Sequence, residues 1–280
     1  MVVTIAIREF GPLTVAAGRI AIAALILMAL LKFLRIPVPK LNTKEGRIIW
    51  FGALLLGAFA MALPFFLLSW GQKYVSSGFA GVSMAAGPIL TLVLAHFFVA
   101  GEQLTFRKGL GFITGFAGVI ILIGFDAFKS SGLGLEPLAR LACIGAVSCY
   151  AIGSIITRLV PPVNPLCFAA IATMLAAIAI VPVSLLMEGF PVVTPSLPLA
   201  AIIFLGVVPT ALANLLLVKV IRSAGPSFIS LVNYQVPVWS VIFGTLFLNE
   251  VLPTRLFIAL ALILLGLAIS QRRKSVKQPL

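Results

Sequence analysis

The residue types that commonly perform covalent chemistry are few in this chain, and they are badly placed for it. Gly81-Val82-Ser83 resembles half of a nucleophile motif, and His96 is the single histidine that could serve as its base. Ser83 and His96 fall in one apolar run thirteen residues apart, and a helix would separate them by about 20 Å. No phosphate-binding G-x-x-x-x-G-K-[ST] loop occurs, and Cys143, Cys149 and Cys167 lack metal-ligand spacing. We therefore expect no enzyme, no metal site and no cofactor.

A few polar residues lie inside long apolar runs, and these favour recognition of a solute. The densest group is Asn233-Tyr234-Gln235, just before Pro237. Proline frees a backbone carbonyl one turn earlier, and polar groups within a membrane face either a partner helix or a water-filled cavity. The matching run from Ser83 to Pro88 carries small residues that leave room. We predict a cavity at these two broken helices, with hydrogen bonding between helices as the alternative.

Other polar candidates come from neighbouring apolar runs. Tyr150 and Tyr234 fall at comparable depth in opposite halves of the chain, where each offers a ring and a hydroxyl to an amphipathic solute or packs against its neighbours. The predicted substrate-cavity residues are Ser83, Pro88, Ser148, Tyr150, Asn214, Asn233, Tyr234, Gln235 and Pro237.

Four charged or titratable residues are candidates for structural or coupling roles: Arg19, His96, Glu102 and Glu250. Arg19 lies well inside an apolar run, so it needs a partner. We expect an ion pair with Glu9 or Glu250, and the sharper alternative is a substrate carboxylate. We interpret His96 as a helix-end polar residue rather than a proton relay. The two glutamates each close one of the two matching runs.

The elements that must position these residues are membrane helices. The chain has 61% hydrophobic and 10% charged residues, whereas soluble chains carry roughly 25% charge. Residues 1–7 are too short to span, so we predict ten helices with the first incomplete. The predicted spans are 12–31, 48–70, 78–100, 109–125, 138–157, 165–187, 197–218, 226–248 and 255–270. The net charge of +13 resides in short loops between them, so we reject nucleic-acid binding.

The chain is built from two copies of one unit. The run 78–102 matches the run 225–250, because Pro88 and Pro237 are 149 positions apart and Glu102 and Glu250 are 148 apart. Each copy holds five helices, and two copies of an odd-numbered unit must be inverted relative to each other. We predict one repeat at 1–125, an outward-facing linker at 126–137, the second repeat at 138–271 and a basic tail at 272–280. Glycines 109, 111, 115 and 118 predict that helix 5 (109–125) and helix 10 (255–270) pack closely, as a scaffold or an interface.

Basic residues predict the orientation in the bilayer. With a cytoplasmic C-terminus, 14 lysines and arginines fall on the cytoplasmic side and 6 on the other. This asymmetry follows the positive-inside rule.

The paired G…P…E runs, Phe247-Leu248-Asn249-Glu250 and the opening FGPLTVAAGRIAIAALIL at 10–27 resemble the EamA branch of the drug/metabolite transporter superfamily. Within it, the chain is most similar to the aromatic amino-acid exporters of bacterial inner membranes. The resemblance implies a multi-pass protein of the inner membrane. The shared motifs are structural, so they specify the fold and not the substrate.

These observations predict an all-α integral membrane protein that exports small metabolites by alternating access. We expect aromatic and other apolar amino acids as cargo, because a weakly charged apolar cavity disfavours phosphorylated solutes. A transporter of sugars, nucleotide-sugars or drugs on the same fold is the alternative, followed by a membrane scaffold or lipid-handling protein. The predicted partners are an amphipathic solute and the lipid bilayer. The oligomeric state stays open, and a monomer is compatible with the sequence.

Overall fold

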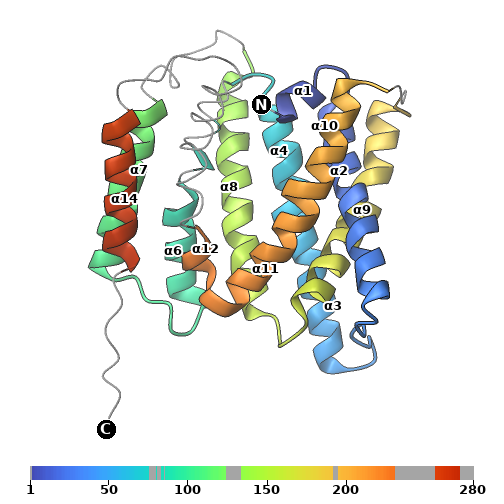
Figure 1. Cartoon of the computed structure of the whole chain (residues 1–280), viewed down its shortest axis with the longest axis horizontal. Coiled ribbons are helices and arrows are strands. Elements are labelled where there is room, and N and C mark those ends of the chain that lie inside the picture. The colour runs from blue at the N-terminus through green and yellow to red at the C-terminus, as the bar shows by residue number, and fades with distance from the viewer. Residues whose placement is uncertain are drawn as a thin grey trace.

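The part of the chain described by the computed structural model is built of helices (Figure 1). It covers residues 2–75, 80, 83–84, 86–123, 134–191, 195–230 and 256–271. The first half contains α1 (Val2–Ala6), α2 (Pro12–Phe33), α3 (Lys44–Gly57), the π-helical turn η1 (Ala58–Ala62), α4 (Leu63–Gly71), α6 (Gly87–Phe98) and α7 (Phe106–Ile123). The second half contains α8 (Glu136–Leu159), α9 (Pro165–Glu188), α10 (Leu197–Gly206), the π-helical turn η3 (Val207–Leu212), α11 (Ala213–Ala224), α12 (Pro226–Ser230) and α14 (Leu256–Gln271).

The helix boundaries follow from local capping chemistry. Thr43, Asn164 and Ser196 precede α3, α9 and α10, and each side chain accepts a hydrogen bond from a backbone N–H of the first turn. Gly189 and Gly225 follow α9 and α11 with φ of 77° and 92°, a backbone conformation that glycine adopts without strain. The predicted spans agree with these helices to within a few residues at most ends. Most of the predicted span 226–248 lies outside the described residues.

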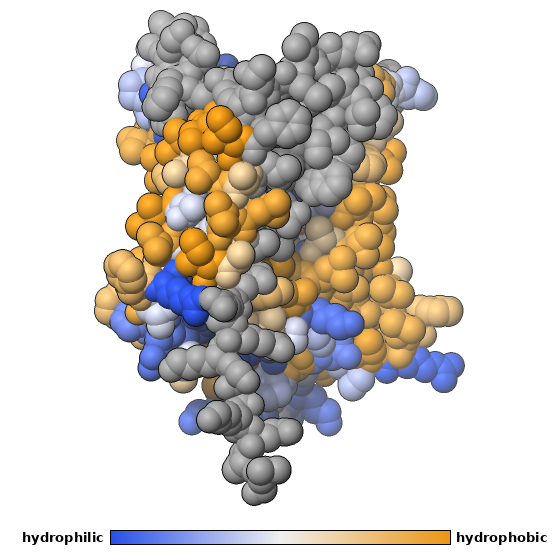
Figure 2. All heavy atoms as spheres, turned by 60° about the vertical axis from the view of Figure 1, so that its left-hand side comes forward, coloured by the Kyte–Doolittle hydropathy of each residue, from blue (hydrophilic) through white to orange (hydrophobic). Residues whose placement is uncertain are grey.

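Among the described residues, five helical stretches are long and apolar enough to cross a membrane: α2, the continuous stretch 44–71, α8, α9 and the continuous stretch 197–224. Their outward faces carry large apolar side chains, and Leu25, Phe51 and Leu186 are 73%, 62% and 86% exposed. Figure 2 shows a hydrophobic band across the face that it presents, with hydrophilic residues gathered mainly below it. Such a surface is suited to lipid rather than to water.

Helices α7 and α14 form a tight antiparallel pair at one edge of the bundle (Figure 1). A Cβ on Gly111 would lie 2.6 Å from the carbonyl oxygen of Gly266, and one on Gly118 would lie 2.9 Å from that of Ala259. As the contact positions move toward the C-terminus of α7, their partners move toward the N-terminus of α14, so the two helices run antiparallel. This close approach agrees with the predicted close packing of helix 5 (109–125) and helix 10 (255–270), which are α7 and α14 in the structure. Gly109 takes no part in it, because a Cβ there would meet nothing within 4 Å.

Helices α2 and α9 form a second antiparallel pair. Near the start of α2, the Thr14 hydroxyl lies 3.3 Å from that of Ser184, and it donates a hydrogen bond to Glu188 at 2.8 Å. Beyond the other end of α2, the Cys167 thiol contacts the carbonyl oxygen of Pro37 at 3.7 Å. The end of α2 thus meets the start of α9, and the start of α2 meets the end of α9.

Two glycines at matching positions in the halves make matching contacts. A Cβ on Gly57 would lie 2.5 Å from the carbonyl oxygen of Ala172 in α9. A Cβ on Gly206, 149 positions later, would lie 2.7 Å from the Ile22 side chain in α2. The middle of the long stretch 44–71 therefore packs closely against α9, and the middle of the stretch 197–224 packs closely against α2.

Four connections meet at the end of the bundle that is rich in basic residues. The Cys167–Pro37 contact joins the α2–α3 loop to the start of α9, and an Arg222 Nη2 donates to the Pro161 carbonyl at 2.9 Å. A Cβ on Gly225 would lie 2.5 Å from Glu102 Oε1, so the turn after α11 touches the α6–α7 loop. The basic residues predicted for the cytoplasmic side that are described all belong to these loops or to the helix ends beside them.

Candidate functional site

A cavity of about 460 Å³ lies between the two halves. This volume is in the range of pockets for small organic molecules. Its walls come from α1, α2, η1, α4, α6, α8, η3, α11 and α12. The polar residues in the lining are Arg19, Ser69, Gln72, Thr91, Tyr150, Ser154, Thr210 and Asn214. Apolar residues, including Met61, Phe65, Leu68, Val147 and Leu217, supply most of the rest.

The wall formed by η3 owes its shape to Pro209. Proline has no N–H, so Pro209 cannot donate to the Leu205 carbonyl one turn earlier, where a regular helix would place a hydrogen bond. The Thr210 hydroxyl donates to this carbonyl at 2.6 Å. The same hydroxyl oxygen accepts a hydrogen bond from Arg19 Nε at 2.9 Å. The proline thus creates a polar anchor that fixes an arginine from a different helix.

Arg19 brings a positive charge to the cavity wall. It lies seven residues into α2, roughly 10 Å along the helix axis, and it is only 9% exposed. Its guanidinium carbon stacks 3.8 Å from the centre of the Phe65 ring. A cation over an aromatic face is attracted by the ring quadrupole. Phe65 in turn contacts Tyr150, with ring centres 6.4 Å apart, so Arg19, Phe65 and Tyr150 form one cluster.

The expected ion pair between Arg19 and Glu9 is wrong. Glu9 accepts a hydrogen bond from the Ser196 hydroxyl at 2.7 Å, ahead of α10. Within the described ranges, the Arg19 guanidinium has Thr210 and Phe65 as its polar and aromatic partners and no carboxylate. The other predicted partner, Glu250, lies outside those ranges.

The predicted cavity residues divide into three groups. Tyr150 and Asn214 line the cavity, and the Asn214 amide nitrogen also donates to the Thr173 hydroxyl at 3.1 Å. Ser83, Pro88 and Ser148 are absent from the lining, and the first two are replaced there by their neighbours Met84 and Gly87. The Ser148 hydroxyl donates instead to the Ile144 carbonyl on its own helix at 3.0 Å. Asn233, Tyr234, Gln235 and Pro237 lie outside the described residues.

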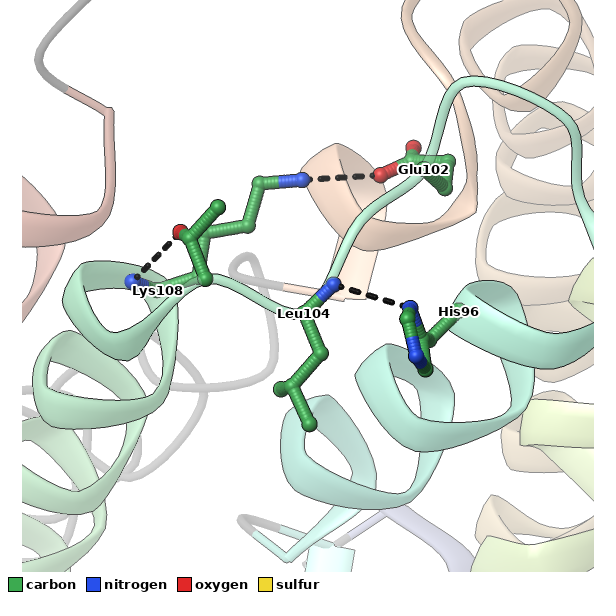
Figure 3. A network of polar contacts seen from close by, with 5 residues as sticks. His96, Glu102, Leu104 and Lys108 are labelled. Carbon is green, nitrogen blue, oxygen red and sulfur yellow. Dashed lines mark hydrogen bonds and ion pairs between the residues drawn. The ribbon is translucent and has the colours of Figure 1, made fainter.

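His96 and Glu102 lie together at the basic end, away from the cavity lining (Figure 3). His96 is exposed, and its Nδ1 accepts a hydrogen bond from the Leu104 backbone N–H at 3.2 Å. Glu102 pairs with Lys108, whose Nζ lies 3.0 Å from Oε2. Both residues hold the α6–α7 loop in place, which is the contact expected of a helix-end polar residue.

Two arginines tie α8 to α11 at the same end. Arg158 donates to the Arg222 carbonyl at 2.6 Å, and Arg222 donates to the Pro161 carbonyl at 2.9 Å. Arg158 thus binds an orphan carbonyl in the last turn of α11, where such groups carry partial negative charge, and Arg222 binds a carbonyl two residues after the end of α8. We call this pair of contacts the arginine clamp. Because α8 and α11 both line the cavity, the clamp holds two of its walls together.

Sequence reasoning missed several residues of the lining. Thr91 and Ser154 lie one helical turn after Pro88 and Tyr150, so the helical period would have placed them on the same faces. Phe65 gave no such signal, because one phenylalanine among many apolar residues cannot be distinguished by type. The two π-helical turns were also missed, although Pro64 and Pro209 beside or within them mark their positions.

Comparison with known proteins identifies the family to which this arrangement belongs. The profile of the EamA-like transporter family matches residues 1–124 and 138–271. The chain belongs to the EamA-like transporter family. It is accordingly a multi-pass membrane protein of a transporter family, as the opening sequence motifs suggested.

Relatives of this chain come from several organisms. An uncharacterized transporter of Archaeoglobus fulgidus is 28% identical, over 78% of this chain and 76% of its own. The uncharacterized inner membrane transporter YedA of Escherichia coli K12 is 26% identical over 96% and 84%. A probable terminal-alkyne amino-acid exporter of Streptantibioticus cattleyicolor is 22% identical over 78% and 72%. One crystal structure matches with a TM-score of 0.76 over 96% of this chain and 91% of that one, at 20% identity, which shows likeness of fold alone.

Proposed function

We propose that this protein exports small amphipathic metabolites, with aromatic and other apolar amino acids as the principal cargo. The observation that carries the proposal is the cavity between the halves, which combines apolar and aromatic walls with a few polar groups and a buried arginine. A zwitterion with an apolar side chain needs this combination. Nucleotide-sugars would need several convergent cations, and Arg19 is the single formally charged residue of the described lining. The role is transport, without a catalytic step.

The proposed architecture is ten transmembrane helices in two inverted five-helix repeats, residues 1–125 and 138–271. The two stretches matched by the family profile support the division. The antiparallel pairs α2–α9 and α7–α14 support the inversion, because each pair joins helices that correspond between the repeats. An axis that relates two antiparallel neighbours runs across them, which places it in the membrane plane. Alternating access then follows from rocking one repeat against the other around the cavity.

The orientation is proposed from charge. The basic loops at one end of the bundle face the cytoplasm under the positive-inside rule. The C-terminus is then cytoplasmic, and the start of α2 with Glu9 and Glu188 lies at the outer side. The inner membrane is the proposed location, in keeping with the name of the relative from Escherichia coli.

The name of the relative from Streptantibioticus cattleyicolor gives independent support for amino acids as cargo. Counterflow into liposomes tests the proposal. Purified protein is reconstituted with unlabelled phenylalanine inside, and entry of radiolabelled phenylalanine is followed with and without a pH gradient. We expect saturable uptake that tyrosine and tryptophan compete away and that the gradient leaves unchanged. The absence of uptake for phenylalanine, leucine and threonine in a folded sample would refute the amino-acid cargo.

A further inference from the structure

The cavity contains a buried cation whose outer nitrogens are not committed to the protein. Arg19 is more than nine-tenths buried. Only its Nε is used, in the hydrogen bond to Thr210, and within the described part of the chain Nη1 and Nη2 have no hydrogen-bond partner. The residue belongs to the cavity lining. A buried guanidinium with two open donors is therefore presented to whatever enters the cavity.

Such a group is costly to bury unless an anion or water meets it. A cation within a membrane protein normally pairs with an anion or faces water. Glu9, one of the two carboxylates predicted to pair with Arg19, instead accepts a hydrogen bond from Ser196. The Phe65 ring covers one face of the guanidinium, which leaves the edge as the side from which a ligand can accept hydrogen bonds. Two parallel N–H donors on a planar edge match the two oxygens of a carboxylate.

The surroundings of this edge favour an organic anion over a bare inorganic one. Phe65 and Tyr150 lie next to Arg19 with ring centres 6.4 Å apart, and Met61 and Leu68 add apolar surface nearby in the lining. A carboxylate with a ring or branched chain attached buries apolar area against these walls while its charge meets Arg19.

We propose that Arg19 is a specificity-determining residue that binds the carboxylate of the cargo through Nη1 and Nη2. This inference rests on the proposed function and narrows it: cargo must carry one carboxylate beside an apolar group. The hydrogen bond from Nε to Thr210 and the stacking on Phe65 hold the guanidinium so that Nη1 and Nη2 can bind the carboxylate. Removing the carboxylate from a cargo molecule then costs hydrogen bonds to a charged group, about 10- to 100-fold in affinity.

Matched pairs of small molecules test the inference on the wild-type protein. The purified full-length protein is heated in detergent with phenylalanine or phenylalaninamide, leucine or leucinamide, and 3-phenylpropanoate or 3-phenylpropanamide. Stabilisation against concentration gives the affinity of each. We expect each carboxylate to bind at least about 10-fold more tightly than its amide. A parallel arm with sodium chloride tests a small inorganic anion.

Variants assign the effect to the guanidinium. Arg19→Met should abolish the preference for carboxylates, and Arg19→Lys should keep part of it because the charge remains without the fork. Thr210→Val removes the hydrogen bond that orients the Arg19 guanidinium, so it should weaken the preference for carboxylates without abolishing it. Ser148→Ala is the control outside the cavity lining and should keep the full preference. A structural role alone would lower the stability of all Arg19 variants without changing the ratio between acid and amide.

The outcomes separate the two proposals. Amides that bind as well as acids, chloride that replaces the acids, or a panel in which no carboxylate binds would each overturn the role of Arg19. If amino acids are transported but their amides compete equally, the exporter stands and the Arg19 inference fails. If 3-phenylpropanoate binds through Arg19 and no amino acid does, the carboxylate site stands and the amino-acid cargo is wrong.

Discussion

The packing of α7 on α14 gives a prediction whose size follows from two distances. In Gly266→Ala, the new methyl group would lie 2.5 Å from the Gly111 carbonyl oxygen and 2.6 Å from the Gly115 nitrogen. Both are backbone atoms, so the helices must separate, and overpacking of this kind costs about 1–3 kcal/mol. Gly109→Ala is the matched control on the same pair, because its methyl group meets nothing within 4 Å. Gly109→Ala should raise the stability by about 0.5–1 kcal/mol, which is the advantage of alanine over glycine within a helix.

Gly266→Ala gains the same helix preference, so the two variants should differ by the overpacking cost alone, about 1–3 kcal/mol. At about 2–4 °C for each kcal/mol, thermal melting in detergent, monitored by size-exclusion chromatography, should place Gly266→Ala at least about 2 °C below Gly109→Ala. Gly111→Ala meets Gly266 in the same interface, so the double variant should lose less than the sum of the single losses. A Gly266→Ala protein that melts at or above Gly109→Ala would refute the close contact of these helices.

Three further changes have expected results. Thr210→Val deprives both the Leu205 carbonyl and Arg19 Nε of a partner, so the protein should lose about 1.5–3 kcal/mol in thermal unfolding, and Thr210→Ser should restore most of it. Glu188→Gln removes the negative charge that accepts the first N–H groups of α2, which should cost about 0.3–1 kcal/mol by the same melt, with the loss shrinking at high salt. Arg222→Lys removes the guanidinium of the arginine clamp and should destabilise the protein by about 1 kcal/mol in thermal unfolding. Lys219→Arg, at an exposed position of the same helix, is the control and should change the stability by under about 0.5 kcal/mol. Equal changes in the two variants would show that the clamp contributes nothing.

The helices were predictable because their signals are local. Apolar length, proline near the first position and a Thr, Asn or Ser just before the helix all act within a few residues. The structure adds Gly57 and Gly206 to the pairs on which the predicted repeat rests, since both need small side chains where a helix of the other half approaches. Gly109 shows the limit of this reasoning. Its spacing matches its neighbours, yet it faces away from α14, and only the rotation of the helix decides that.

The cavity was predictable as a region and less so as a set of side chains. Tyr150 and Asn214 could be selected because a polar group deep in an apolar run needs a partner or a cavity. Ser148 met the same criterion but satisfies its hydroxyl on its own helix at Ile144, an option that is always open to serine. The presence of a polar residue in an apolar run therefore does not tell whether its side chain lines a cavity or bonds to a carbonyl of its own helix.

Arg19 shows why partners are harder to predict than positions. Its burial was evident from the sequence, and a carboxylate partner followed from charge alone. The actual partner depends on Pro209, which withholds an N–H from the Leu205 carbonyl and brings the Thr210 hydroxyl to that place. Thr210 lies 191 positions from Arg19 in the sequence. Only the packing of α2 against the π-helical turn brings them together, so the residue proposed to bind the cargo is positioned by a π-helical turn in the other half of the chain.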